Sequence, residues 1–292
     1  MSARSGWLSD WTTEALADRF CYTPLGNLLV RLLLPTRVRA NQVSFASMCA
    51  GIASGVCYAL WTPATIVAAG LFVAASVILD AADGALARAR KAPSEIGKLF
   101  DNAADGVKGG SIALGLALGM HFAESFGPPV LPGVPLWVQI WGTSALTGFG
   151  LLWQVTDRNH FVSQWELFGN GVRQSSYAST ERLEQELAGL RAQGGFWLER
   201  VVLAVLLPFA PRREAPAVPV PPPVPGYRER LLPYVHAWTF FNGAAQLSVI
   251  CLASIAGTPL WGMLAVVAGS VCQLPLRWLT LAAHRRALRA AA

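Results

Sequence analysis

Six apolar stretches, each close to 20 residues long, most constrain what this chain can fold into. They cover residues 43–60, 64–88, 96–121, 136–155, 235–256 and 259–282. A helix needs roughly 20 predominantly apolar residues to cross the hydrocarbon core of a bilayer. The charged fraction of 14% is also well below the roughly 25% of a soluble domain. The sequence therefore predicts an all-α integral membrane protein with six transmembrane helices.

The positions of lysine and arginine predict the orientation of these spans. With the N-terminus inside, the outer loops fall near residues 61–63, 122–135 and 257–258, and none of them contains Lys or Arg. Cytoplasmic loops are the ones that carry an excess of these residues. We therefore expect a multi-pass protein of a bacterial-type cytoplasmic membrane, with both termini and the Asp80–Asp105 loop in the cytoplasm. This distribution accounts for the net charge of +6 without a nucleic-acid partner.

The spans divide the chain into four predicted segments. Residues 1–40 contain two amphipathic patterns, typical of helices that lie in the membrane interface, although the same faces could pack on a soluble partner. Residues 41–156 hold the first four spans and the acidic motif described next. Residues 157–234 form a predicted cytoplasmic insertion, with an amphipathic helix near 180–193 and a proline-rich tether. Residues 235–292 provide the last two spans and a basic C-terminal tail.

Two pairs of aspartates flank the short basic loop between the second and third spans. Asp80 and Asp83 end one apolar run, and Asp101 and Asp105 open the next. Spacings of three and four residues place each pair on one helix face, and the loop turns the chain so that the pairs can face each other. Charged groups at a membrane edge are costly unless they are neutralised. Carboxylate-only ligation suits Mg²⁺ or Mn²⁺, so we expect a site for divalent cations of this kind.

Small and basic residues around these aspartates favour a phosphate-containing ligand. Gly84 and Gly97 lack a Cβ atom, so a flat ligand or a second backbone can come close to the helices. Arg88, with Arg90 and Lys98 nearby, supplies positive charge for phosphate groups. The alternative, in which the aspartates only form ion pairs with these cations, would not explain the two glycines.

The complete motif resembles the signature of the CDP-alcohol phosphotransferases, also called CDP-alcohol phosphatidyltransferases. It reads Asp80-x2-Asp83-Gly84-x2-Ala87-Arg88-x8-Gly97-x3-Asp101-x3-Asp105, and every fixed position is matched. The segment Ala40-Asn41-Gln42-Val43-Ser44 also resembles the family's Pro-Asn-x-Ile/Val-Thr segment, with Ala in place of Pro and Ser in place of Thr. The 157–234 insertion is longer than the family's usual loop, and the resemblance says nothing about it.

The resemblance implies a magnesium-dependent transfer of a substituted phosphate from a CDP-linked donor to an alcohol, with release of CMP. It implies that Asp80, Asp83 and Asp101 bind two metal ions, Mg²⁺ or Mn²⁺, and that Asp105 is both a ligand and the general base. It places the CDP moiety at Gly84, Ala87, Arg88, Gly97 and Asn41. It also suggests a homodimer formed through membrane helices; Gly115 and Gly119 offer a close-packing face, although such a face can equally pack within one protomer.

The acceptor is less well defined by the sequence. Lys108 lies three residues after Asp105 on the same helix face, and it could contact an anionic acceptor or simply counter Asp105. With Arg158 and Arg277 it could form a basic acceptor pocket, although Arg158 could equally anchor the chain at the inner membrane surface.

Several functions are compatible with the motif. The first is phospholipid synthesis from CDP-diacylglycerol and a small polar alcohol, and the alternative is transfer from CDP-choline or CDP-ethanolamine to diacylglycerol. An aspartate-rich membrane prenyltransferase is more distant, since that class needs acidic motifs at two separate places. A carboxylate-based transporter would need polar residues along several spans, which are nearly free of them.

Overall fold

The computed structural model describes residues 17–90, 95–124, 131–171, 183–186, 188–189, 197, 201 and 220–290. Within these residues the protein is helical and contains no strand. The first described elements are a π-helix, Asp18–Tyr22, and α1, Thr23–Leu33. The longer elements are α2 Ala40–Leu60, α3 Pro63–Ala89, α4 Glu95–Phe122, α5 Leu136–Asn170, α8 Tyr227–Trp238, α9 Gly243–Ile255 and α10 Pro259–Arg289, and a 3-10 turn, Thr239–Phe241, joins α8 to α9. The predicted all-α class is confirmed.

Three of these helices, α2, α3 and α10, are long and apolar enough to cross a membrane. The segments Tyr227–Phe241 and Gly243–Ile255 add a fourth candidate if they form one span that is bent by 41°. These helices fit an integral membrane protein. The first half of α4 carries the charged residues of the motif, and α5 buries polar residues such as Gln139 and Gln154, so neither helix has a comparable apolar stretch. The six spans, their orientation and the interfacial helices therefore remain predictions.

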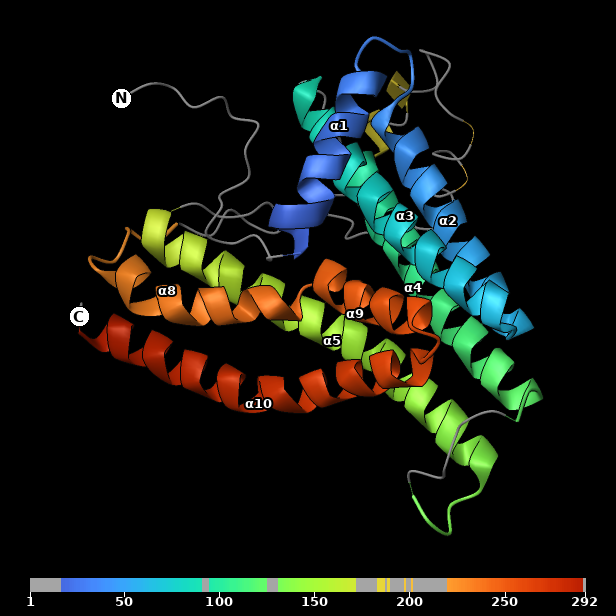
Figure 1. The fold of residues 1–292 in the computed structure, drawn as a ribbon. Helices are drawn as coiled ribbons and strands as arrows, with labels where there is room; N and C mark the ends of the chain where they lie inside the picture. The colour runs from blue at the N-terminus through green and yellow to red at the C-terminus, as the bar shows by residue number, and fades with distance from the viewer. Residues whose placement is uncertain are drawn as a thin grey trace.

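The helices form two groups that share one apolar core (Figure 1). In one group α2, α3 and α4 pack side by side, and in the other α5, α8, α9 and α10 run along one another. Tyr58 of α2, Val73 of α3, Leu116 of α4 and Ile250 of α9 are buried together where the groups meet. The Tyr58 hydroxyl also forms a 2.6 Å hydrogen bond with Ser254 Oγ of α9. This junction fixes the first three long helices, which carry the motif, against the rest of the chain.

Helices α2 and α4 approach each other at glycines. A Cβ atom on Gly115 would lie 2.1 Å from the carbonyl oxygen of Gly55, and one on Gly119 would lie 2.1 Å from the carbonyl oxygen of Tyr58. Such distances are possible only for glycine, so the Gly115 and Gly119 face is used to pack α4 on α2 within the protomer. The homodimer expected from the family resemblance therefore loses the support of this face and stays a prediction.

The region predicted as a cytoplasmic insertion begins and ends in helix. Helix α5 continues to Asn170, well past residue 155, where the fourth predicted span ends, and stops where Gly171 adopts a positive φ of 66°. Trp165 of α5, Tyr227 and Leu231 of α8 and Ala287 of α10 form a buried cluster there. Of the predicted amphipathic helix near 180–193, residues 183–186 and 188–189 are described and are helical; most of the predicted tether lies outside the described residues.

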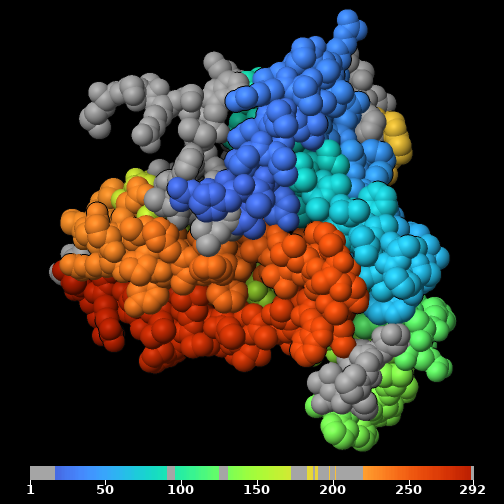
Figure 2. Space-filling view, in the orientation of Figure 1, coloured from blue at the N-terminus to red at the C-terminus, as the bar shows by residue number. Residues whose placement is uncertain are grey.

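The N-terminal helices lie across the two groups of helices, as Figure 2 shows in blue beside orange and cyan. Gly26 of α1 lies against the backbone of Ala81 and Ala82 on α3. On the other side, Tyr22 forms a 2.7 Å hydrogen bond with Ser248 of α9. The leucines of α1 that face away from the protein are exposed: Leu25, Leu28 and Leu32. This pattern supports an interfacial location for α1, and the first predicted amphipathic pattern lies largely outside the described residues.

Candidate active site

The structure brings three of the four motif aspartates together between α3 and α4. Asp80 lies in the second half of α3, and Asp101 and Asp105 lie in the first half of α4. One carboxylate oxygen from each lies within 4.8 Å of the others. Both helices pack on α2, so the glycine contacts between α2 and α4 hold the carboxylates of α4 in reach of α3.

The fourth aspartate, Asp83, lies one turn beyond Asp80 and is buried, with 6% of its surface exposed. Its Oδ2 atom has no hydrogen-bond partner among the described residues, and neither does the buried Oδ1 atom of Asp101. Buried polar atoms in folded proteins almost always have a partner. Unpaired carboxylate oxygens beside two further carboxylates fit the oxygen-only ligand set of a divalent cation, so these residues suit the predicted metal site.

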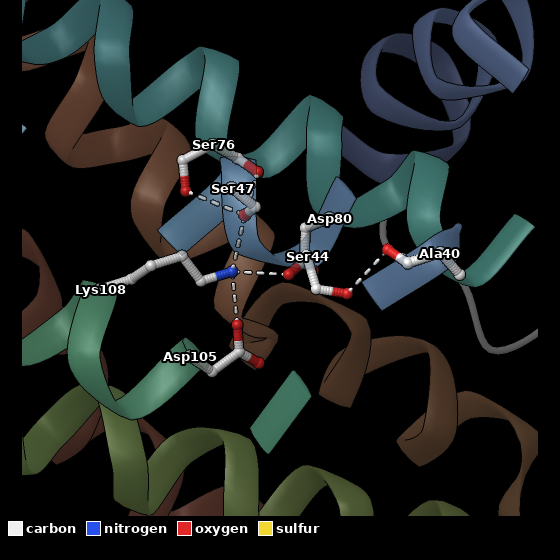
Figure 3. A network of polar contacts seen from close by, with 7 residues as sticks. All are labelled: Ala40, Ser44, Ser47, Ser76, Asp80, Asp105 and Lys108. Atoms are coloured by element: carbon white, nitrogen blue, oxygen red, sulfur yellow. Dashed lines mark hydrogen bonds and ion pairs between the residues drawn. The ribbon is translucent and has the colours of Figure 1, made fainter. Parts of the chain in front are cut away.

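Lys108 is buried in the centre of this cluster (Figure 3). Its Nζ atom lies 2.5 Å from Asp80 Oδ1 and 2.5 Å from Asp105 Oδ1. It also donates a 3.2 Å hydrogen bond to Ser47 Oγ on α2. The Ser47 hydroxyl in turn donates to the carbonyl oxygen of Ser76 on α3. The network therefore joins α2, α3 and α4 around one ammonium group.

The residues expected to bind the donor come from the same end of the α2–α4 group. Asn41 lies in the first turn of α2, Gly97 in the first turn of α4, and Gly84 and Ala87 near the end of α3. Arg88 is exposed, and a Cβ atom on Gly84 would lie 3.3 Å from its Nη1 atom. The glycine thus leaves room beside an accessible guanidinium group, as a phosphate ligand would require.

Arg90, considered above as a phosphate ligand, has a structural role. Its guanidinium donates 2.9 Å hydrogen bonds to the carbonyl oxygens of Leu33 and Thr36, and a third bond to that of Val38. These bonds tie the end of α3 to the segment between α1 and α2. Arg90 therefore positions the N-terminal helices beside the site.

The two other predicted acceptor residues lie on the second group of helices. Arg277 of α10 forms a 3.1 Å ion pair with Asp157 of α5. Arg158 donates a 3.0 Å hydrogen bond to Asn159, and burial lowers the pKa of its guanidinium, an effect that Asp18 opposes. Asp157 and Asn159, the partners named here, both belong to α5 and not to the aspartate cluster, so the role of the two arginines in binding an acceptor stays a prediction.

Asp18 is a candidate site residue that the sequence patterns did not reveal. Burial raises the pKa of this carboxyl; a hydrogen bond from Asn242 and the charge of Arg158 lower it, and the charge of Asp80 raises it. Asp18 therefore lies near both Asp80 and Arg158. In the sequence it was one of several polar residues in an amphipathic pattern. The contact with Asn242, 224 residues away, shows that the π-helix packs against the start of α9.

The fold and the site define the class of protein: a helical membrane protein with a carboxylate cluster between two adjacent long helices. Residues 37–167 match the family model described as CDP-alcohol phosphatidyltransferase. The segment that carries the motif is therefore similar to that family. This similarity points to phosphotransfer from a CDP-alcohol in phospholipid synthesis. A comparison with curated proteins finds no relative that matches the chain.

Proposed function

We propose that the protein transfers a substituted phosphate from CDP-diacylglycerol to the hydroxyl group of a small polar alcohol and releases CMP. The observation that carries this proposal is the convergence of Asp80, Asp101 and Asp105 to within 4.8 Å, inside a motif with every fixed position matched. The exposed leucines of α1 and the apolar surfaces of the spans support a donor that reaches the site from the membrane.

The four aspartates would hold two divalent ions, Mg²⁺ or Mn²⁺. Bound there, the ions would supply charge that polarises the pyrophosphate and stabilises the departing CMP. Arg88, exposed beside Gly84, is placed to bind a phosphate oxygen of the donor. The carboxylates of Asp83 and Asp101, each with one unpaired oxygen, would supply negative charge that holds the ions.

Asp105 is the proposed general base. Its side chain is 54% exposed, so a hydroxyl group can approach it. As the alcohol oxygen forms a bond to the phosphorus of the transferred group, the proton of the hydroxyl passes to an Asp105 oxygen. The bond from that phosphorus to the bridging oxygen breaks, and the bridging oxygen leaves with CMP.

Donor and acceptor can be identified together with purified protein. Labelled CDP-diacylglycerol is supplied with a panel of small alcohols and alcohol phosphates, and both CMP and the lipid product are measured. We expect CMP release that requires one member of the panel. Parallel reactions with CDP-choline or CDP-ethanolamine as donor and diacylglycerol as acceptor test the alternative function. If only those reactions give product, the proposed donor is wrong.

Removal of metal tests the catalytic centre. EDTA should abolish CMP release, and added Mg²⁺ or Mn²⁺ should restore it, because the proposed reaction requires a cation at the carboxylates. Ca²⁺ serves as the comparison ion, since it prefers longer bonds and more ligands. Turnover that persists in EDTA would exclude a metal-dependent mechanism.

A further inference from the structure

The position of Lys108 has a consequence for metal binding. Its side chain is 4% exposed, and its ammonium group contacts carboxylates from two helices, Asp80 of α3 and Asp105 of α4. These are two of the three residues whose oxygens converge. The lysine therefore occupies the space between carboxylates that a divalent ion would also use.

Helix α2 fixes the rest of the Lys108 side chain. A Cβ atom on Gly51 would lie 2.6 Å from Lys108 Cγ, so the lysine chain fills the space that a larger residue at position 51 would take. Ser47 Oγ accepts a 3.2 Å hydrogen bond from Nζ, and its own proton is directed to the Ser76 carbonyl oxygen at 2.8 Å. The lysine is thus held by backbone packing as well as by charge.

The hydrogen bonds of Lys108 are complete within the protein. An ammonium group has three donor hydrogens, and Asp80, Asp105 and Ser47 provide three acceptors. While this network is formed, no donor hydrogen remains for an acceptor phosphate. Of the two roles that the sequence left open for Lys108, the geometry favours that of a counterion.

We propose that Lys108 is an internal counterion that neutralises the metal-free site and competes with divalent ions for Asp80 and Asp105. The inference rests on the proposed function, in which these carboxylates are metal ligands. A positive charge beside the ligand oxygens repels an incoming dication. Lys108 therefore weakens metal binding and, in exchange, keeps the carboxylates together before the metal arrives.

The test compares two substitutions of Lys108 in the full-length protein purified in detergent. Lys108→Met keeps most of the apolar chain and removes the charge, whereas Lys108→Arg keeps the charge. Thermal unfolding is measured in EDTA and in Mn²⁺, and Mn²⁺ affinity is measured from the electron paramagnetic resonance signal of the free ion. Ser47→Ala, which removes one neutral contact of the ammonium, is the matched control.

We expect Lys108→Met to unfold at a clearly lower temperature than the wild type in EDTA, with Mn²⁺ recovering most of the loss. Its Mn²⁺ dissociation constant should fall by about tenfold or more, since a unit charge near a dication costs more than 1 kcal/mol even in water. Lys108→Arg and Ser47→Ala should stay close to the wild-type affinity. A Met variant that is stable only in Mn²⁺ would also support the proposal.

Equal destabilisation of Lys108→Met in EDTA and in Mn²⁺, or failure to fold in either condition, would show that the lysine serves packing and would overturn the inference. Equal effects of the Met and Arg variants would do the same. These results differ from a failure of the proposed function. In that case Mn²⁺ would neither bind nor stabilise the wild-type protein, and Asp101→Asn would change nothing.

Discussion

Asp105 combines the greatest exposure of the three clustered carboxylates with direct contact to Lys108. Asp80 and Asp101 are less accessible, so they are better placed to hold ions than to exchange protons with a substrate. The single charge of Lys108 is shared between Asp80 and Asp105. A substitution at Asp105 therefore acts on the proton acceptor while it leaves the Asp80–Lys108 pair in place.

We expect Asp105→Asn to retain binding of the CDP-linked donor and to lose CMP release. An amide cannot accept the proton of the attacking hydroxyl, and loss of a general base costs about 10²–10⁴-fold in rate. Donor binding to the purified variant is the control for folding. Turnover near the wild-type rate would show that another group removes the proton.

His284 predicts how stability depends on pH. Its Nδ1 atom forms a 2.6 Å hydrogen bond with the Tyr227 hydroxyl near the end of α10. Burial lowers the pKa of His284, and the charges of His160 and Arg285 lower it further. Because the folded pKa is below the ordinary value of about 6.5, the unfolded chain binds the proton more readily. Stability is then full above that pH and falls as the pH drops toward the folded pKa.

Thermal unfolding between pH 7.5 and 5.5 tests this expectation. His284→Gln should reduce the loss of stability at low pH, because glutamine has no proton to gain. Identical pH profiles for wild type and His284→Gln would contradict the assignment.

The sequence predicted contacts between site residues on one helix, but not contacts between residues on different helices. Helical spacing was enough to place Lys108 on the face of Asp105. It could not show that Asp80 lies at the same 2.5 Å distance, since that distance depends on how α3 and α4 pack on α2. The sequence could not predict the position of Asp18 either, because its partner Asn242 lies on a segment that is distant in sequence.

At the scale of the helices, the packing of α4 on α2 determines the geometry of the site. The contact of Gly115 with Gly55 lies two turns from Lys108 on the same helix. Any separation of the two helices would draw Asp101, Asp105 and Lys108 away from α3.

We expect Gly115→Leu to destabilise the protein and to lower activity, because overpacking of a close contact costs about 1–3 kcal/mol. A Cβ atom on Gly110, in contrast, meets nothing within 4 Å. Gly110→Ala should therefore be neutral or stabilising, since alanine favours a helix by about 1 kcal/mol over glycine. Thermal unfolding and CMP release are measured for both variants. Equal stability and activity of the two variants would show that the close contact between α2 and α4 is not needed for the geometry of the site.

Helix boundaries were predictable where apolar runs coincide with turn signals. The turn between α2 and α3 falls where Trp61 to Pro63 predicted it, with Thr62 as the N-cap of α3. The extension of α5 to Asn170 was not predicted, because its stabilising contacts with Tyr227 and Ala287 come from segments that are distant in sequence. The bend at Asn242 was missed likewise, since the apolar pattern continues through it.

At the scale of the whole molecule, the distribution of lysine and arginine predicts the orientation in the membrane. The positive-inside rule predicts that residues 131–134 face outward and the segment between α1 and α2 faces inward. Single cysteines can be introduced at Leu131 and at Arg37, after replacement of the five native cysteines.

A membrane-impermeant maleimide should label Leu131→Cys in intact cells. It should label Arg37→Cys only after the cells are made permeable, because the second residue lies on the cytoplasmic side in the predicted topology. Labelling in the opposite pattern would invert the orientation and would place the aspartates on the outer face.

The contacts of the π-helix also bear on how the protein is assembled during synthesis. Helices α2, α3 and α4 follow one another in the chain, so they can pack as soon as residue 122 has been synthesised. The bonds from Asp18 to Asn242 and from Tyr22 to Ser248 span 224 and 226 residues. Helix α1 can pack on α3 before these bonds form, but the π-helix makes its polar contacts with Asn242 and Ser248 only after that part of the chain has been synthesised.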